Sequence, residues 1–137
     1  MKNIFIPIFL LLLMVSCHQK SWEERCSAEA IEYTLTHCPL DVGNGIILDS
    51  LTYNAATNTN TYYYIVTDVA DNDSFFQVRK TDIENDFLSA IASSIDLKPK
   101  KEHGTKLQYI YHSGSTKKKL FDCTFGPNES GGYGKIK

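Results

Sequence analysis

After an apolar leader, the hydrophobic residues of the chain first recur at the spacing that is typical of a helix. Over residues 22–37 (WEERCSAEAIEYTLTH), apolar side chains return every three or four positions, which is the spacing of one helix face. The pattern predicts a helix here. Pro39 ends it, because proline disfavours helical backbone in the residue before it. The predicted buried face consists of Ala28, Ile31, Leu35 and Cys38.

A second helical period lies in the middle of the chain. Thr81 and Glu84 have the spacing of a capping box, in which the threonine oxygen accepts a backbone N–H and the glutamate reaches back. We expect a helix from Thr81 to about Asp96, and residues 74–80 fit either a short strand or a turn of helix. The predicted buried face consists of Ile83, Phe87, Leu88, Ile91 and Ile95.

Four stretches rich in β-branched and aromatic residues predict strands. They span residues 46–53, 61–67, 106–112 and 118–125. A polar turn separates the first two and another separates the last two, so each pair predicts a hairpin, while residues 98–104 read as a basic loop. The order is α-β-β-α-β-β. It predicts an α+β fold with two helices packed on one face of a four-stranded antiparallel sheet.

The leader is too short to span a membrane. Lys2 precedes an almost wholly apolar run from Ile4 to Val15, about a dozen residues, whereas a bilayer requires roughly 20. A basic start with a short apolar centre is typical of a secretion signal. The sequence from Met14 to Cys17 resembles the bacterial lipobox, which implies cleavage before Cys17 and a diacylglycerol on its sulfur. The alternative is an ordinary cleaved signal with a chance cysteine.

These features divide the chain into four segments. Residues 1–16 are the predicted signal peptide, 17–21 a lipidated N-terminus with a polar stalk, 22–125 an α+β domain, and 126–137 a flexible, glycine-rich tail. No acidic run follows Cys17, which favours an outer-membrane anchor that faces the periplasm. Loss of Lys2 with the leader shifts the net charge from −2 to −3, which argues against a general nucleic-acid binder.

Three cysteines remain beyond the lipid-attachment site. Cys26 and Cys38 lie twelve residues apart in one predicted helix, about 18 Å along its axis, and a disulfide needs Cα atoms about 5.5 Å apart. Cys38 and Cys123 both point toward the layer between helix and sheet. We therefore predict a disulfide between Cys38 and Cys123, which leaves Cys26 as a free thiol.

Candidate chemistry is sparse. The four histidines, His18, His37, His103 and His112, lack metal-ligand spacing, so we predict no metal site, and no cofactor motif is present. No motif predicts a catalytic residue. The sequence leaves open a small envelope hydrolase or thiol-redox protein that uses Cys26 or a carboxylate.

Tyrosines mark the candidate binding face. We expect Tyr62, Tyr64, Tyr109 and Tyr111 to form a solvent-facing aromatic surface for an envelope protein or a glycan. Residues alternate between the two faces of a strand, so Tyr63 points away from Tyr62 and Tyr64. The alternative is that these amphipathic side chains simply cover an open sheet face.

Four segments carry a resemblance to a group of proteins. They are HCPLD (37–41), GIILDSLTY (45–53), YYYIV (62–66) and LQYIY (107–111). With the lipobox, this pattern resembles small exported or lipid-anchored proteins of Bacteroides-type bacteria. The resemblance implies a fold and an envelope location but no chemistry. The expected function is a membrane-anchored envelope lipoprotein that acts as a non-enzymatic binding or assembly module.

Overall fold

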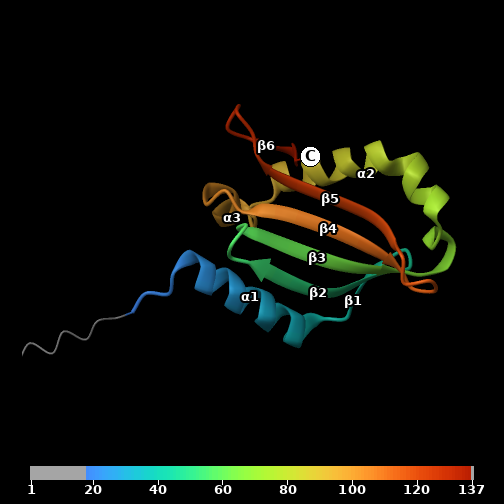
Figure 1. The fold of residues 1–137 in the computed structure, drawn as a ribbon, viewed down its shortest axis with the longest axis horizontal. Coiled ribbons are helices and arrows are strands. Elements are labelled where there is room, and N and C mark those ends of the chain that lie inside the picture. The colour runs from blue at the N-terminus through green and yellow to red at the C-terminus, as the bar shows by residue number, and fades with distance from the viewer. Residues whose placement is uncertain (1–17, 137) are drawn as a thin grey trace, which may run out of the picture.

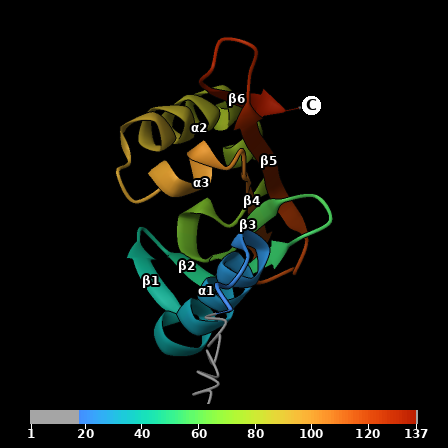
Figure 2. The ribbon, with the colours of Figure 1, turned by 90° about the vertical axis from the view of Figure 1, so that its left-hand side faces the viewer.

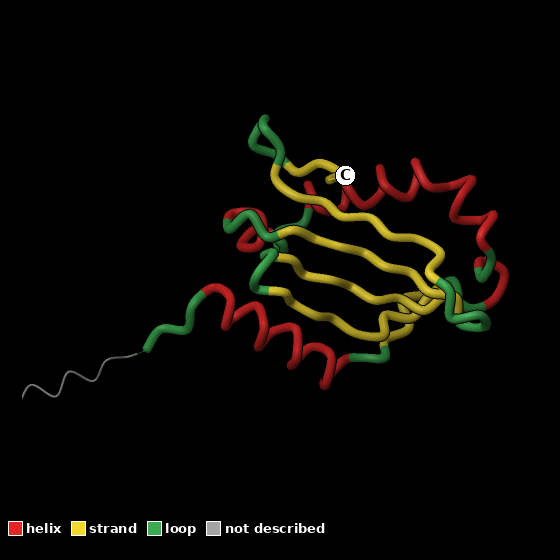
Figure 3. Tube along the Cα trace, in the orientation of Figure 1, coloured by secondary structure: helices red, strands yellow, loops and turns green. Residues whose placement is uncertain are grey.

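The computed structural model describes residues 18–136. The predicted signal peptide (1–16) and the predicted lipid attachment at Cys17 lie outside the described residues. These residues form three helices, a short 3-10 helix and six strands. Figures 1 and 3 show that the strands make a curved sheet. In chain order the elements are α1 (Trp22–His37), β1 (Leu40–Gly43), β2 (Ile46–Asn54), β3 (Thr59–Val66), η1 (Asp68–Ala70), α2 (Asp73–Ser93), α3 (Lys98–Glu102), β4 (Lys106–Ser113), β5 (Lys119–Pro127) and β6 (Tyr133–Ile136).

The fold is α+β, but the sheet differs from the predicted one. It has six strands in the order β1-β2-β3-β4-β5-β6. Both predicted hairpins are present, since β2 pairs antiparallel with β3 and β4 with β5, whereas β3 and β4 are parallel. The helices α2 and α3 return the chain to the end of the sheet where β3 begins, and parallel pairing needs such a crossover. The prediction of four antiparallel strands is therefore wrong.

All of the packed core lies on one face of the sheet. Side chains from β2 to β5 on this face form two clusters, one under α1 and one under α2. Figure 1 shows α1 beside β2 and α2 beside β5, and Figure 2 shows α2 and α3 on the same side of β4 and β5. The other face carries the half-buried Tyr63, Ile65, Ile110 and His112.

Helix α1 has the predicted bounds but buries a different face. Ser21 caps it in a capping box with Glu24. The buried residues are the small Cys26 and Ala30, and Ala30 packs with Leu48 and Leu51 of β2. Small residues let the helix approach the sheet closely. The predicted stripe is therefore wrong, because it points to solvent: Ile31 is 61% exposed and Leu35 78%.

Helix α2 begins eight residues before the predicted Thr81. Asn72 is its N-cap, and its side-chain oxygen accepts a hydrogen bond from the Phe75 N–H at 2.8 Å. Thr81 lies inside the helix, where no capping group is needed. Ile83, Phe87, Leu88 and Ile91 pack into the core as predicted, but Ile95 follows the end of the helix and is 84% exposed.

Two further segments differ from expectation. The predicted basic loop contains α3, on which Lys100 is buried. The predicted flexible tail contains β6, which pairs antiparallel with β5. The Ile136 side chain packs over Gly126, where an added Cβ would lie 2.3 Å from Ile136 Cδ1. The glycine-rich segment therefore contains a strand of the sheet.

The predicted disulfide is absent, and Cys26, Cys38 and Cys123 are all free. Cys38 packs with Leu48 in the cluster under α1, whereas Cys123 belongs to the cluster under α2. Strands β3 and β4 separate β2 from β5, and at about 4.8 Å per strand this distance is roughly 14 Å. A disulfide needs Cα atoms about 5.5 Å apart. Cys38 and Cys123 thus lie on the same face of the sheet but too far apart to form a disulfide.

The contrast between Ile91 and Ile95 tests the assignment of the core. Ile91 is 1% exposed and Ile95 84% exposed, although both belong to the helical stripe predicted from the sequence. We expect Ile91→Ala to lower the free energy of unfolding by ~2–5 kcal/mol. The matched Ile95→Ala should change it by less than ~0.5 kcal/mol. Urea denaturation measures both, and equal costs would contradict the packing described.

Candidate functional site

Four tyrosines form the centre of the candidate site. Tyr62 and Tyr64 lie on β3, and the parallel register places Tyr109 and Tyr111 of β4 directly opposite. The rings stack in two pairs, with centroids 5.0 Å apart for Tyr62 and Tyr109 and 4.6 Å for Tyr64 and Tyr111. Below, these four residues are called the tyrosine quartet.

The tyrosine quartet lies on the helix-covered face of the sheet. Tyr109 is 6% exposed and Tyr111 8%, while Tyr62 and Tyr64 are half-buried. The expectation of a solvent-facing surface is therefore wrong for the β4 pair. The alternation of strand residues was correctly anticipated, because it is Tyr63 that lies on the open face.

Two hollows between α1 and α2 lie beside three of the quartet residues: Tyr62 and Tyr64 line one, Tyr111 lines the other, and Tyr109 lines neither. Below, the two hollows together are called the groove. A hollow of about 360 Å³ lies over β3, and one of about 270 Å³ lies against α2. Both linings mix aliphatic, aromatic and charged side chains. The first is lined by Glu29, Tyr33, Leu40, Val42, Leu48, Leu51, Tyr62, Tyr64, Asp96, Leu97 and Lys100. The second is lined by Ile83, Asp86, Phe87, Ala90 and Tyr111.

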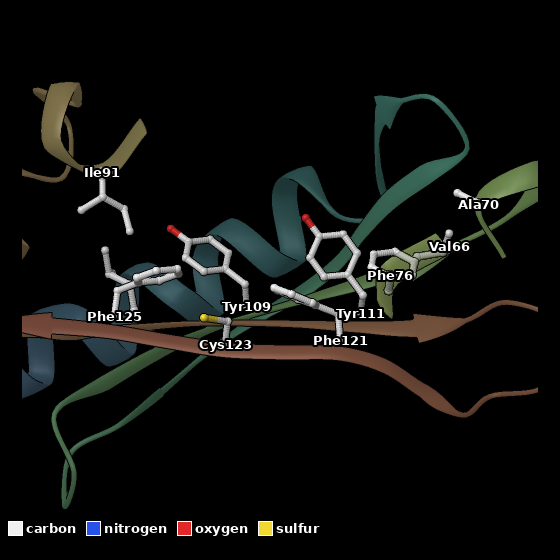
Figure 4. Close-up of a cluster of buried hydrophobic side chains, with 10 residues drawn as sticks. Val66, Ala70, Phe76, Ile91, Tyr109, Tyr111, Phe121, Cys123 and Phe125 are labelled. Atoms are coloured by element: carbon white, nitrogen blue, oxygen red, sulfur yellow. The ribbon is translucent and has the colours of Figure 1, made fainter. Parts of the chain in front are cut away.

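The quartet hydroxyls have no hydrogen-bond partner among residues 18–136. The hydroxyls of Tyr53 and Tyr133, by contrast, donate to Asn58 and to backbone carbonyls. Figure 4 shows the hydroxyls of Tyr109 and Tyr111 pointing away from the strands, toward the helix layer. Their oxygens still reach solvent, because the fully buried side-chain polar atoms without a partner in this part of the chain are Asn60 Oδ1 and Asp71 Oδ1. The quartet hydroxyls are thus free to hydrogen-bond to water or to a ligand beside them.

Burial also affects the ionisation of these hydroxyls. Desolvation raises the pKa of Tyr64 to about 12 and raises the pKa of each of the other three quartet residues. The physical cause is that a phenolate is poorly solvated in this environment. The four groups are therefore neutral at physiological pH and act as hydrogen-bond donors and acceptors.

An ion pair closes one end of the groove. Lys100 Nζ of α3 donates to Glu29 Oε1 of α1 at 2.5 Å. The lysine side chain is 8% exposed and the glutamate 58%. The pair connects α1 with α3 and compensates the charge of a nearly buried ammonium group.

The groove lining carries more negative than positive charge. Glu29, Asp86 and Asp96 contribute three carboxylates, and Lys100, already paired, contributes one ammonium group. No local pattern in the sequence indicates these roles. Lys100 belongs to the run KPKKE, in which only the tertiary structure distinguishes it from its neighbours.

Cys26 lies on the buried face of α1 and lines neither hollow of the groove. It is 1% exposed, and burial raises the pKa of its thiol. A reactive cysteine needs the opposite, a lowered pKa and access to solvent. Between residues 18 and 136, no group of three His, Cys, Asp or Glu side chains is placed to bind a metal ion.

Comparison with known proteins shows a family and a fold. A family model described as "Domain of unknown function (DUF8479)" matches residues 21–121. No curated protein matches the chain. The crystal structure of a "putative secreted protein" from Pseudomonas aeruginosa superposes with a TM-score of 0.64 at 13% identity. The match covers 82% of this chain and 98% of the other, which shows a shared fold. Within residues 18–136, no helix has the length and hydrophobicity needed to cross a bilayer.

The raised tyrosine pKa values predict a loss of stability at high pH. Tyrosines in the unfolded chain ionise near pH 10, whereas Tyr64 in the folded chain ionises at about 12. Between these values the unfolded chain releases a proton that the folded chain retains, so the free energy of unfolding falls as pH rises. We expect Tyr64→Phe to reduce this fall by roughly 2 kcal/mol at pH 12. Urea denaturation from pH 9 to 12 measures it; parallel curves for the two proteins would contradict the assignment.

Proposed function

We propose that this chain, which belongs to the family described as a domain of unknown function (DUF8479), is an exported protein that binds a ligand in the groove between α1 and α2. The tyrosine quartet carries this proposal. Two of its side chains are more than nine-tenths buried, yet none of the four hydroxyls has a partner among residues 18–136. The four hydroxyls still reach solvent, so a ligand can hydrogen-bond to them without breaking a contact within the protein.

The location follows from the leader and the start of the fold. A short apolar run with a lipobox-like end supports export and a lipid anchor at Cys17. The structural neighbour, described as a secreted protein, supports export as well. Only residues 18–21 separate Cys17 from α1, so an anchored domain would sit close to the membrane surface. We place it at the outer membrane, facing the periplasm.

The groove supports binding better than catalysis. Its lining combines apolar side chains with the neutral Tyr62, Tyr64 and Tyr111. Of its carboxylates, Glu29 is held by Lys100. The buried Cys26 gives no support to the thiol-redox alternative. The chain is accordingly a non-enzymatic binding module of the envelope, with an envelope component as its ligand.

Mass spectrometry of the protein isolated from membranes tests the anchor. We expect the mature chain to begin at Cys17 and to carry a diacylglycerol thioether, because the lipobox-like sequence ends there. Cys17→Ser should move the protein from the membrane fraction to the soluble fraction, since acyl chains supply the attachment. A mature chain with an unmodified Cys17 would refute the anchor and leave the groove proposal standing.

A thermal-shift screen tests the groove. The mature chain carrying Cys17→Ser is mixed with random peptides, oligosaccharides or fatty acids. A ligand at 100 times its Kd stabilises by ~2.7 kcal/mol, so the binding class should raise Tm by several degrees.

Substitution of the quartet localises the effect. The isosteric Tyr62→Phe, Tyr64→Phe double variant removes two hydroxyls from the groove and should lose most of the shift. Tyr63→Phe removes one from the opposite face and should retain it. If no class shifts Tm, or if both variants respond alike, the groove is not the binding site.

A further inference from the structure

We infer that the ligand is an extended peptide with a net positive charge and apolar side chains. This inference rests on the proposed function and names the ligand class of the same groove. Three observations carry it: the spacing of the quartet hydroxyls, the use of the ring faces, and the charge of the groove lining.

The quartet presents hydrogen-bonding groups at the repeat of an extended chain. Tyr62 and Tyr64 are two residues apart on β3, as are Tyr109 and Tyr111 on β4. Two residues of strand span about 6.7 Å. The backbone carbonyls along one edge of an extended peptide recur at the same interval. A peptide that runs along β3 would therefore meet the hydroxyls of Tyr62 and Tyr64, which line the same hollow, at two of its residues that are two positions apart.

The stacking of the rings disfavours a sugar. Carbohydrates bind aromatic side chains through the open ring face. Here Tyr62 stacks on Tyr109, and Tyr109 stacks on Phe87 of α2 with centroids 4.1 Å apart. The ring faces are thus used within the protein, and the hydroxyl edges remain for the ligand. A fatty acyl chain would fit the aliphatic part of the lining but would leave those hydroxyls unpaired.

The charge of the lining selects among peptides. The ammonium group of Lys100 is matched by Glu29, so the carboxylates of Asp86 and Asp96 determine the net charge of the groove. Both belong to exposed residues, one beside the hollow against α2 and the other beside the hollow over β3. Apolar side chains of the peptide would face the aliphatic part of the lining. Its lysine or arginine side chains would reach these carboxylates.

Selection from a phage-displayed random heptapeptide library against the mature Cys17→Ser chain tests the inference. We expect the enriched peptides to carry a net positive charge and apolar residues at alternate positions. Their affinity, measured by titration calorimetry, should fall as NaCl rises from 50 to 500 mM, because salt screens the charge contacts. It should also fall at least fivefold in the Tyr62→Phe, Tyr64→Phe variant.

Two isosteric variants isolate the charge contribution. Asp86→Asn with Asp96→Asn removes both groove carboxylates and should lower affinity about tenfold at 50 mM NaCl. Glu129→Gln removes an exposed carboxylate from the turn between β5 and β6 and should change it less than twofold. Equal effects would show that only the overall charge of the protein matters, which would overturn the inference.

The remaining outcomes separate the two proposals. Enrichment of neutral or acidic peptides overturns the charge preference. Failure to enrich any peptide, with a thermal shift from oligosaccharides or fatty acids that depends on Tyr62 and Tyr64, overturns the inference but retains the groove. If no peptide, oligosaccharide or fatty acid binds, both the groove proposal and the peptide inference are overturned.

Discussion

The parallel contact between β3 and β4 is the interaction on which the rest of the structure depends. It joins two antiparallel halves, β1–β3 and β4–β6, into one sheet. The stacks of Tyr62 on Tyr109 and Tyr64 on Tyr111 cross this contact. Each aromatic pair contributes ~0.5–1.5 kcal/mol beyond the burial of its area. The same rings therefore hold the halves together, and three of them, Tyr62, Tyr64 and Tyr111, line the groove.

The groove exists because the two helices cover the sheet at its sides and not at its centre. Small residues bring α1 close to β2, while the large Phe87 of α2 reaches over β4. Between them Tyr62 and Tyr64 are covered only in part. The ion pair of Lys100 with Glu29 fixes the spacing of α1 and α3 at one end. Core packing and ligand access are consequently set by the same few contacts.

Local patterns in the sequence predicted the elements better than their arrangement. The bounds of α1 were predicted correctly, and β2 and β4 to within a residue, because their signals are local. The buried face of α1 was not predicted correctly. The larger residues Ile31 and Leu35 suggested a buried stripe, but tertiary packing leaves both exposed to solvent. The parallel pairing of β3 with β4 depends on where a long crossover ends, and no local signal reports it. The quartet was found from its residue type, while its environment could be seen only in the fold.

The crossover between β3 and β4 has a consequence for how the molecule assembles. Within each half, neighbouring strands are joined by turns of a few residues, whereas residues 67–105 separate β3 from β4. Closing this long connection costs more chain entropy than closing the turns, and contacts distant in sequence form slowly. We therefore expect each half to gain its hairpins first and the central contact to form last. In an exported chain whose N-terminus crosses the membrane first, the groove would thus be complete only after the second half has also crossed.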